Sequence, residues 1–325
     1  MKTTAVQIAS TGGPDVLQLV DIEVPAPGPG EALVEHTAIG LNFIDTYQRS
    51  GLYPVSLPTG LGSEAAGVVR EVGAGVDTVS PGDRVVYTGG PLGAYAGARS
   101  FPADRLIRIP KGISDEQAAA VLLKGLTAWY LLYHSYPARS GDTVLVHAAA
   151  GGVGLLLCQW ARHRGVKTIG VVGSAEKARV AEANGCTHTL LADTPELAAQ
   201  VRELTDGRGV QGVYDSVGKD TFFASLDSLA PHGVMVSYGN ASGVPEPFSV
   251  MELARRHSLF VTRPVLFDFL TTRADLLKAS ETLFNLVADG TLRITIGQRY
   301  ALADVAQAHR DIEARRTHGS TVLLP

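Results

Sequence analysis

Hydrophobic and polar positions follow two different patterns along the 325-residue chain. Up to about residue 120 the apolar stretches are short and β-like, at 17–24, 31–39, 68–72 and 84–87, and turns rich in proline and glycine separate them. Many short strands between such turns are typical of a barrel-like all-β unit. The first third of the chain is therefore expected to be rich in β-structure.

From residue 115 the pattern changes to helices that alternate with strands. A helix is predicted at 115–133, and Val153, Leu156, Leu157 and Trp160 lie on one face of a second helix at 152–164. Further helices are predicted after Ser174, which would cap one, and at 195–205, 221–230 and 251–256. The predicted strands are 143–147, 167–172, 188–191, 210–215, 233–238 and 259–262. Six strands with intervening helices predict an α/β fold with a doubly wound parallel sheet.

The C-terminal segment departs from this alternation. Its pattern predicts helices at 274–288 and 302–316 and strands at 293–296 and 321–324. We expect this segment to return to the first domain. The predicted domains are therefore a β-rich domain from 1–122 and 264–325 and a Rossmann domain from 123–263, with a ligand cleft between them.

Composition excludes several classes of protein. Charged residues make up 18% and hydrophobic residues 45%, so general disorder is excluded. The net charge of −4 gives no basic field, and we therefore expect neither a nucleic acid nor a membrane as partner. The N-terminus does not resemble a signal peptide, and two cysteines support no disulfide scaffold. These features predict a cytoplasmic protein.

A glycine-rich turn follows the first strand of the alternating region. Residues 143–154 combine a strand, a turn and the start of a helix, with Ala149, Gly151 and Gly154 in an A-x-G-x-x-G frame. Dinucleotide sites need this pattern because the turn is tight, the backbone faces a pyrophosphate and a small residue lets helix and strand pack. The phosphates then bind at the N-terminus of the helix. A purely structural turn is the alternative, but the strand before and the amphipathic helix after it favour a dinucleotide.

The end of the second strand indicates which dinucleotide. An NAD site places a carboxylate there, about 20 residues after the turn, but this chain has Val172, Gly173 and Ser174, followed by Lys177. A hydroxyl and an ammonium group suit a 2′-phosphate. Lys177 could instead be an ordinary solvated lysine. The missing carboxylate favours NADPH over NADH.

Motifs along essentially the whole chain resemble the zinc-free quinone oxidoreductases, the zeta-crystallin-like group of the medium-chain dehydrogenase/reductases. These motifs are residues 40–47, 49–54, 62–67, 81–85, 123–127, 147–154, 214–218 and 237–240. The resemblance implies a chaperonin-10-like barrel beside the Rossmann domain. Zinc-dependent relatives carry a cysteine near residues 42–45 and a histidine where this chain has Ser63, so no metal is expected.

The resemblance implies NADPH-dependent reduction of quinones by hydride transfer in the interdomain cleft, without zinc. Hydride delivery to an electrophilic acceptor depends mainly on position and orientation. Two alternatives stay open: an NADPH-dependent reductase of enone or alkenal double bonds, and an NADPH-binding or RNA-binding protein with little turnover. A homodimer is expected, because the strand at 259–262 would be a sheet edge that a second copy could pair.

The resemblance also implies the site residues. Asn42, Asp45 and Tyr53 are the expected catalytic residues, although Tyr53 could be a packing aromatic beside Pro54. The expected cofactor-binding residues are Asn42, Lys124, Thr127, Gly151, Gly152, Val153, Ser174, Lys177, Tyr238, Gly239, Asn240 and Arg315. Bacterial relatives often have a tyrosine at the 2′-phosphate where this chain has Ala192, so one contact that distinguishes NADPH from NADH is lost.

Overall fold

The computed structural model describes residues 1–325 and divides the chain into two compact units. Unit 1 contains Met1–Lys124, Leu270–Ala288 and Ile294–Pro325, and unit 2 contains Gly125–Phe269 and Asp289–Arg293. The C-terminal segment therefore returns to the unit formed by the N-terminal third. No helix is long and apolar enough to cross a membrane.

Unit 1 is built mainly from antiparallel strands. They are β1 (Lys2–Ile8), β2 (Gln18–Glu23), β3 (Glu31–Leu41), β4 (Thr59–Gly60), β5 (Glu64–Val72), β6 (Arg84–Thr88), β7 (Ala98–Pro102), β8 (Ile107–Arg108), β15 (Ile296–Ala301) and β16 (Ser320–Leu324). One sheet has the order β2-β1-β4, and the other runs β15-β16-β3-β5-β6-β8 with β7 also paired to β3. β16 pairs with the end of β3, where Thr321 lies opposite Leu41. The last strand of the chain thus supports the strand that leads into Asn42.

Four helices complete unit 1 or begin in it. They are α1 (Phe43–Ser50), α2 (Asp115–Tyr130), α8 (Arg273–Ala288) and α9 (Val305–Glu313). α2 starts with a capping box, because the Ser114 hydroxyl accepts from the Gln117 N–H and the Gln117 side chain accepts from the Ser114 N–H. α1 and α9 lie beside each other. The core of the unit includes Tyr87, Tyr95 and Phe101, all fully buried.

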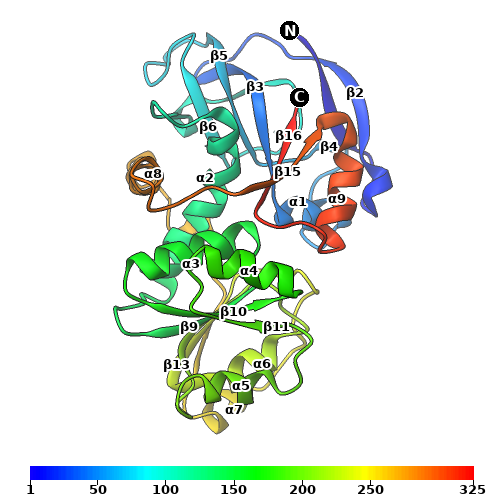
Figure 1. Ribbon diagram of the computed structural model, residues 1–325. Coiled ribbons are helices and arrows are strands. Elements are labelled where there is room, and N and C mark those ends of the chain that lie inside the picture. Colours follow the sequence, from blue (N-terminus) through cyan, green and yellow to red (C-terminus); the bar gives the residue numbers. More distant parts are fainter. The chain divides into compact units, whose positions relative to one another are not determined.

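Unit 2 confirms the predicted doubly wound parallel sheet. Its strands are β9 (Thr143–His147), β10 (Lys167–Val172), β11 (His188–Leu191), β12 (Val210–Asp215), β13 (Leu229–Ser237) and β14 (Phe260–Thr262), in the order β11-β10-β9-β12-β13-β14. Its helices are α3 (Gly152–His163), α4 (Ala175–Ala183), α5 (Leu197–Glu203), α6 (Phe222–Asp227) and α7 (Met251–Arg255). α3 and α4 cover one face of the sheet, and α5 and α6 cover the other (Figure 1). The strand order reverses between β9 and β12, and ligands bind at the carboxyl ends of such strands.

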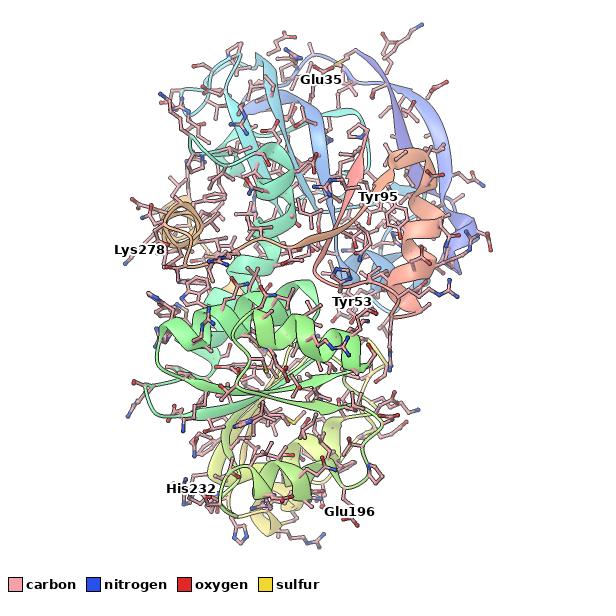
Figure 2. All side chains as sticks on the ribbon, viewed as in Figure 1. Glu35, Tyr53, Tyr95, Glu196, His232 and Lys278 are labelled. Atoms are coloured by element: carbon pink, nitrogen blue, oxygen red, sulfur yellow. The ribbon has the colours of Figure 1, made fainter.

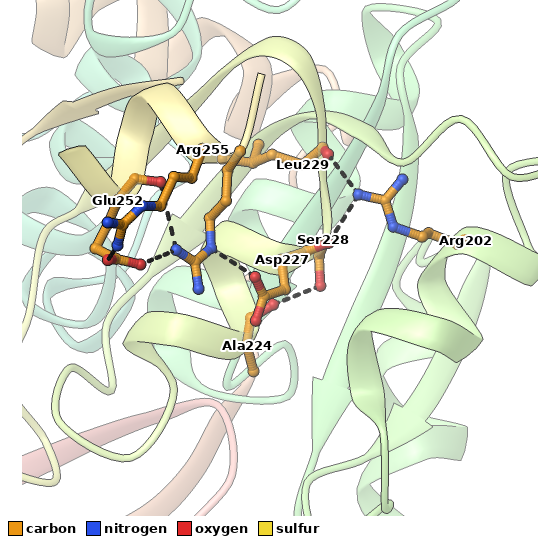
Figure 3. A network of polar contacts seen from close by, with 8 residues as sticks. Arg202, Ala224, Asp227, Ser228, Leu229, Glu252 and Arg255 are labelled. Carbon is orange, nitrogen blue, oxygen red and sulfur yellow. Dashed lines mark hydrogen bonds and ion pairs between the residues drawn. The ribbon is translucent and has the colours of Figure 1, made fainter. Parts of the chain in front are cut away.

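Side-chain ion pairs join the helices on the second face of this sheet. Arg256 donates to the Asp227 carboxylate at 2.6 Å and pairs with Glu252 in α7, while Arg202 in α5 donates to the backbone oxygens of Asp227 and Leu229 (Figure 3). These contacts connect α5, α6, α7 and the start of β13.

Two sequence predictions need correction. The strand predicted at 293–296 is wrong, since β15 begins at Ile296 and ends at Ala301. The predicted strand overlaps β15 only at Ile296. The apolar pattern did not reveal the rest, because β15 is an edge strand whose positions are half-buried or exposed. The helix predicted at 115–133 ends as an α-helix at Tyr130 and continues as a π-helical turn, Leu131–Ser135.

Candidate active site

Asn42, Glu64 and Lys124 form a compact polar group at the end of β3. Asn42 Nδ2 donates to Glu64 Oε2 at 2.8 Å, and Lys124 Nζ donates to Asn42 Oδ1 at 2.7 Å. Lys124 Nζ also lies 3.5 Å from Glu64 Oε2, and Glu64 Oε1 accepts from the Leu123 N–H at 2.6 Å. Asn42 is 5% exposed, Glu64 0% and Lys124 7%. The group therefore holds a buried ion pair that an amide side chain bridges.

Glycine at position 40 makes room for this group. A Cβ atom there would lie 2.3 Å from Glu64 Oε2 and 2.3 Å from the Ala119 backbone oxygen. Asn42 Nδ2 also donates to the Gly40 backbone oxygen at 3.2 Å, so both amide hydrogens have acceptors within the protein. The structure thus uses Asn42 to orient Lys124 and Glu64.

Asp45 lies in the first turn of α1 and is completely buried. Its Oδ2 atom accepts from the Asn42 N–H at 2.9 Å and from the Tyr95 hydroxyl at 2.7 Å, whereas Oδ1 has no hydrogen-bond partner. Burial raises the pKa of Asp45 from 3.8 to about 7, although these two hydrogen bonds and the charge of Lys124 act in the opposite direction. Asp45 can therefore hold a proton near neutral pH.

Tyr95 connects Asp45 to helix α9. The Tyr95 hydroxyl lies 3.2 Å from His309 Nε2, and the two rings meet edge to face. His309 Nδ1 lies 3.4 Å from Arg49 Nη1, and Arg49 binds the Glu313 carboxylate through two nitrogens at 2.6 and 3.0 Å. Figure 2 shows Tyr95 inside unit 1, on the side where α1 and α9 lie.

Tyr53 belongs to an aromatic row that begins on α1. Its ring centroid lies 5.1 Å from that of Tyr47, which in turn lies 5.6 Å from that of Phe43. The Tyr53 N–H donates to the Tyr47 backbone oxygen at 3.0 Å, which fixes the chain after Gly51 ends the helix in the left-handed region. Tyr53 is half-buried.

The glycine turn in unit 2 has the geometry of a phosphate site. Gly151 caps α3 in an extended conformation, and Ala148 has a positive φ of 51°. A Cβ on Gly154 would lie 2.4 Å from the Ala148 oxygen, so only glycine allows the helix to start this close to the turn. The first N–H groups of Gly152 and Val153 belong to a helix N-terminus, where intrahelical acceptors are lacking. The turn therefore fits a pyrophosphate.

The other expected cofactor residues of unit 2 also follow strands at the same sheet edge. Ser174 follows β10, and its hydroxyl caps α4 by accepting from the Lys177 N–H at 3.2 Å. Tyr238, Gly239 and Asn240 follow β13. A Cβ on Gly239 would lie 2.5 Å from the Ser216 oxygen, so this glycine brings the ends of β12 and β13 together.

A buried network underlies this edge. Asp215 Oδ2 accepts from the hydroxyls of Thr221 and Ser225 at 2.7 and 2.8 Å, and Asp215 Oδ1 accepts from the Gly218 N–H at 3.1 Å. His147 Nε2 lies 2.9 Å from the Ser225 hydroxyl. The network fixes the ends of β9 and β12, the two strands at which the order of the sheet reverses.

The structure thus brings together some of the expected residues within each unit. In unit 1, Asn42 contacts both Asp45 and Lys124, and Tyr53 follows on the same segment. Arg315 also lies in unit 1, exposed after α9 with φ of 57°. Thr127 is half-buried in the part of α2 that belongs to unit 2.

Sequence reasoning missed four residues of the unit 1 network: Glu64, Tyr95, His309 and Arg49. Two of them, Glu64 and Arg49, stood inside motifs that resembled the family, so a signal existed but no role was assigned. Tyr95 and His309 had no local signal, because Tyr95 meets Asp45 from 50 residues away and His309 meets Tyr95 from 214 residues away.

Comparisons with known proteins agree with this architecture. Residues 28–111 match the alcohol dehydrogenase GroES-like domain, which confirms the predicted chaperonin-10-like part, and residues 152–278 match the zinc-binding dehydrogenase family. The quinone oxidoreductase of Pseudomonas aeruginosa is 52% identical over 321 residues, which are 98% of this chain and 99% of that protein. The 2-haloacrylate reductase of a Burkholderia species is 45% identical and covers 99% of this chain and 98% of its own.

A solved structure extends the comparison. The crystal structure of the Escherichia coli quinone oxidoreductase complexed with NADPH has a TM-score of 0.97 to this chain at 47% identity. It covers 99% of this chain and 100% of its own. The similarity therefore extends over both units.

The zinc named in the second family's description does not fit the residues present. No group of three or more His, Cys, Asp or Glu side chains comes together in a way that could hold a metal ion. A catalytic zinc site needs three such protein ligands. At the end of β3 the carboxylate of Glu64 instead lies 3.5 Å from the ammonium group of Lys124.

Proposed function

The chain belongs to the quinone oxidoreductases of the medium-chain dehydrogenase/reductase family, and on this basis we propose that it reduces quinones with NADPH. The observation that carries the proposal is the buried polar group at the end of β3. It offers a positive charge on Lys124 and an acid, Asp45, that holds a proton near neutral pH. Reduction of a quinone by a hydride equivalent needs both, because negative charge develops on one oxygen and a proton must neutralise it.

We assign the following roles in unit 1. Lys124 stabilises the negative charge on the reduced oxygen, and Glu64 and Asn42 hold its ammonium group in place. Asp45 holds the proton that completes the hydroquinone. Tyr53 packs against the quinone ring or donates a hydrogen bond to it, in keeping with its half-buried phenol.

The cofactor residues of unit 2 fit NADPH. Gly151, Gly152 and Val153 would hold the pyrophosphate at the N-terminus of α3, and Ser174 and Lys177 would hold the 2′-phosphate. Thr127, Tyr238, Gly239 and Asn240 from unit 2, together with Lys124 and Arg315 from unit 1, complete the proposed set. When bound, NADPH supplies the hydride.

Absorbance of the nicotinamide tests this function directly. Purified protein is mixed with 1,4-benzoquinone and with NADPH or NADH at equal concentrations. Quinone-dependent loss of NADPH, faster than that of NADH, is expected. Lys124→Met should lower kcat/KM about 10²–10³-fold, the range for loss of one group that stabilises an oxyanion. No oxidation of either nucleotide by any small quinone would overturn the proposal.

Reduction of an activated carbon–carbon double bond is a second candidate, favoured by the similarity to a 2-haloacrylate reductase. Such a substrate also develops negative charge on an oxygen and takes up one proton, so the same Lys124 and Asp45 would serve it. The two reactions differ in their products. Mass spectrometry that found a saturated carboxylic acid or ketone, formed faster than hydroquinone, would favour the second candidate.

We also propose a homodimer through the edge strand β14. Phe260 in this strand is 59% exposed, and Val250 and Met251 nearby in sequence are 75% and 54% exposed. Unpaired strand edges with apolar side chains tend to be covered, and a twofold axis lets two copies cover each other. Light scattering should give twice the chain mass of 34.2 kDa for the wild type and one chain mass for Phe260→Lys. A monomeric wild type would refute the dimer.

A further inference from the structure

Three buried side chains from distant parts of unit 1 form a line of hydrogen bonds that ends at Asp45. Arg49 Nη1 lies 3.4 Å from His309 Nδ1, His309 Nε2 lies 3.2 Å from the Tyr95 hydroxyl, and that hydroxyl donates to Asp45 Oδ2 at 2.7 Å. Arg49 is 2% exposed, and the other members are fully buried. Such a line is costly to bury unless every polar atom is satisfied, which raises the question of its role.

The direction of the line follows from its first member. A guanidinium group can only donate, so His309 Nδ1 must accept from Arg49 and the ring proton must sit on Nε2. The Nε2–H group then donates to the Tyr95 oxygen, and the single hydroxyl proton of Tyr95 is directed to Asp45. Every donor in the line thus points toward Asp45 Oδ2.

Other contacts keep this direction fixed. Arg49 is anchored by Glu313 and by the Gly12 backbone oxygen at 3.1 Å, so it cannot turn away from His309. Burial, with the charge of Arg49 acting in the same direction, lowers the pKa of His309 from 6.5 to about 3. His309 therefore stays neutral and keeps one donor and one acceptor. Gly62 leaves space for the Tyr95 ring, since a Cβ there would lie 2.2 Å from it.

We propose that Arg49, His309 and Tyr95 are positioning residues that present one fixed donor to Asp45 Oδ2 and so reserve Oδ1 for the proton delivered to the substrate. This inference rests on the proposed function of the site. Its geometric basis is that the two oxygens of the Asp45 carboxyl group differ in their hydrogen bonds. Oδ2 receives two hydrogen bonds, from Tyr95 and from the Asn42 N–H, and Oδ1 receives none. A proton on Oδ1 leaves both of those bonds intact.

Five charged or titratable groups act on Asp45, either directly or through Tyr95. Lys124 on α2 favours its ionised form, and Glu64 on β5 favours its protonated form. Tyr95 donates from the segment between β6 and β7, while His309 on α9 and Arg49 on α1 act on Asp45 through Tyr95. Among them, Tyr95 is the group whose hydrogen bond can be removed without removing a charge. It is therefore the residue to change first.

A purely structural role is the competing explanation. Asp45 Oδ2 caps the start of α1 through the Asn42 N–H, and the line of hydrogen bonds could simply attach α9 to α1. Such a role predicts that loss of the Tyr95 hydroxyl lowers stability and leaves the protonation of Asp45 unchanged. The positioning role predicts a change of protonation, because one hydrogen bond to the ionised form is lost.

Infrared titration of the protein without cofactor separates these explanations. The carboxylic-acid C=O band of Asp45 is isolated as the difference between a protein and the same protein carrying Asp45→Asn, at each pH. The expected midpoint is near 7 in the wild type. In Tyr95→Phe it should rise by about 1–2 pH units, the range for one lost hydrogen bond to a charged group. The matched control is Tyr87→Phe, which removes a buried tyrosine–histidine hydrogen bond of 3.0 Å with His36 elsewhere in unit 1. Its midpoint should stay at the wild-type value.

A second pair of variants addresses His309 and covers a failure of Tyr95→Phe to fold. The amide of His309→Gln can accept from Arg49 and donate to Tyr95, so the midpoint should stay within about 0.3 pH units of wild type. His309→Leu leaves the Tyr95 hydroxyl without a donor and weakens the bond that it gives to Asp45, so the midpoint should rise. Equal midpoints in the glutamine and leucine variants, or an unchanged midpoint in Tyr95→Phe, would overturn the inference.

The activity arm connects the line to the reaction. If Asp45 delivers the proton, kcat/KM for the quinone falls as pH rises through its midpoint, and this limb should move upward in Tyr95→Phe together with the infrared band. A moved band with an unmoved limb would show that the line does not serve the reaction. A wild type without quinone reductase activity would overturn the proposed function, while the infrared arm would still decide whether Tyr95 and His309 control Asp45.

Discussion

The buried ion pair of Glu64 and Lys124 should couple strongly in a double-mutant cycle. Lys124 Nζ lies 3.5 Å from Glu64 Oε2, and the two side chains are 8% and 0% exposed. At an effective dielectric constant of about 20, two unit charges at this distance attract by about 5 kcal/mol. Removal of one partner leaves the other charge buried and unpaired, which costs about 3–5 kcal/mol.

The three variants therefore differ in a defined way. Glu64→Gln and Lys124→Met should each lower the free energy of unfolding of unit 1 by about 3–5 kcal/mol. The double variant should cost less than either single variant, because it leaves no unpaired charge. The Gln side chain keeps an acceptor for the Leu123 N–H, whose bond to Glu64 is 2.6 Å long, but its amide nitrogen replaces the acceptor of Asn42 Nδ2. The Glu64→Gln variant and the double variant both lose that acceptor.

Native-state hydrogen exchange with mass spectrometry is the suitable assay. Both tryptophans, Trp129 and Trp160, belong to unit 2, so tryptophan fluorescence does not follow unit 1. Exchange is read in peptides from β3 and β5, which carry or flank the pair, and in peptides from β10 of unit 2 as reference. Additivity of the two single variants within about 0.5 kcal/mol would refute the coupling.

The same pair gives a pH dependence of known sign. Burial raises the pKa of Glu64, and Lys124 opposes this rise. A carboxyl group whose pKa is raised in the folded state binds its proton more tightly there, so its contribution to stability is lost as pH rises. Lys124→Met removes the opposing charge, so its stability deficit should grow with pH. A deficit that shrinks as pH rises would contradict this account.

Three further predictions concern other parts of the chain. Gly154→Ala should lower the free energy of unfolding by about 1–3 kcal/mol, because its Cβ would lie 2.4 Å from a backbone oxygen. It should also weaken NADPH binding, measured by calorimetry. The control Gly13→Ala, whose Cβ would have no atom within 4 Å, should have neither effect. Lys177→Ala should raise KM for NADPH about 10–100-fold and leave KM for NADH unchanged. The control Lys167→Ala, at the opposite end of β10, should change neither KM. Equal effects of Lys177→Ala on both nucleotides would contradict the 2′-phosphate assignment. Burial lowers the pKa of His36 from 6.5 to about 4, so the unfolded chain binds a proton between these pH values and the folded protein does not. The free energy of unfolding should therefore fall by about 3 kcal/mol as the pH is lowered from 6.5 to 4. In urea unfolding, His36→Asn should not show this fall.

Much of unit 2 was predictable because its signals are local. The strand, glycine turn and helix at 143–163 lie next to one another in sequence, and each residue of the turn has a role that neighbouring backbone imposes. Gly154 is needed because the Ala148 oxygen is six residues away, and Ser174 caps the helix that starts one residue later. Patterns of this kind survive in a single sequence, since the interacting parts are never far apart.

The edge strand β15 shows where such signals stop. Its first three positions are all half-buried, and a register shift occurs between Ile296 and Gln298. A Cβ on Gly297 would lie 2.1 Å from the His318 oxygen, so the shift depends on a contact with a segment about 20 residues later. Periodicity in the sequence alone could not place the strand, because its register is set by β16.

The network around Asp45 shows the same limit for the site. Sequence reasoning selected Asn42, Asp45 and Lys124, because each lies in a motif. It could not select Tyr95 or His309, since a buried tyrosine or histidine far from any motif has no distinguishing local pattern. They are identified by the hydrogen bonds that each must make. The Arg49 guanidinium can only donate, so it fixes the tautomer of His309, and the His309 ring then fixes the direction of the Tyr95 hydroxyl. The direction of the hydrogen bond that Asp45 receives from Tyr95 thus depends on His309, which reaches Tyr95 from 214 residues later in the chain. Loss of that direction should be visible first in the protonation of Asp45.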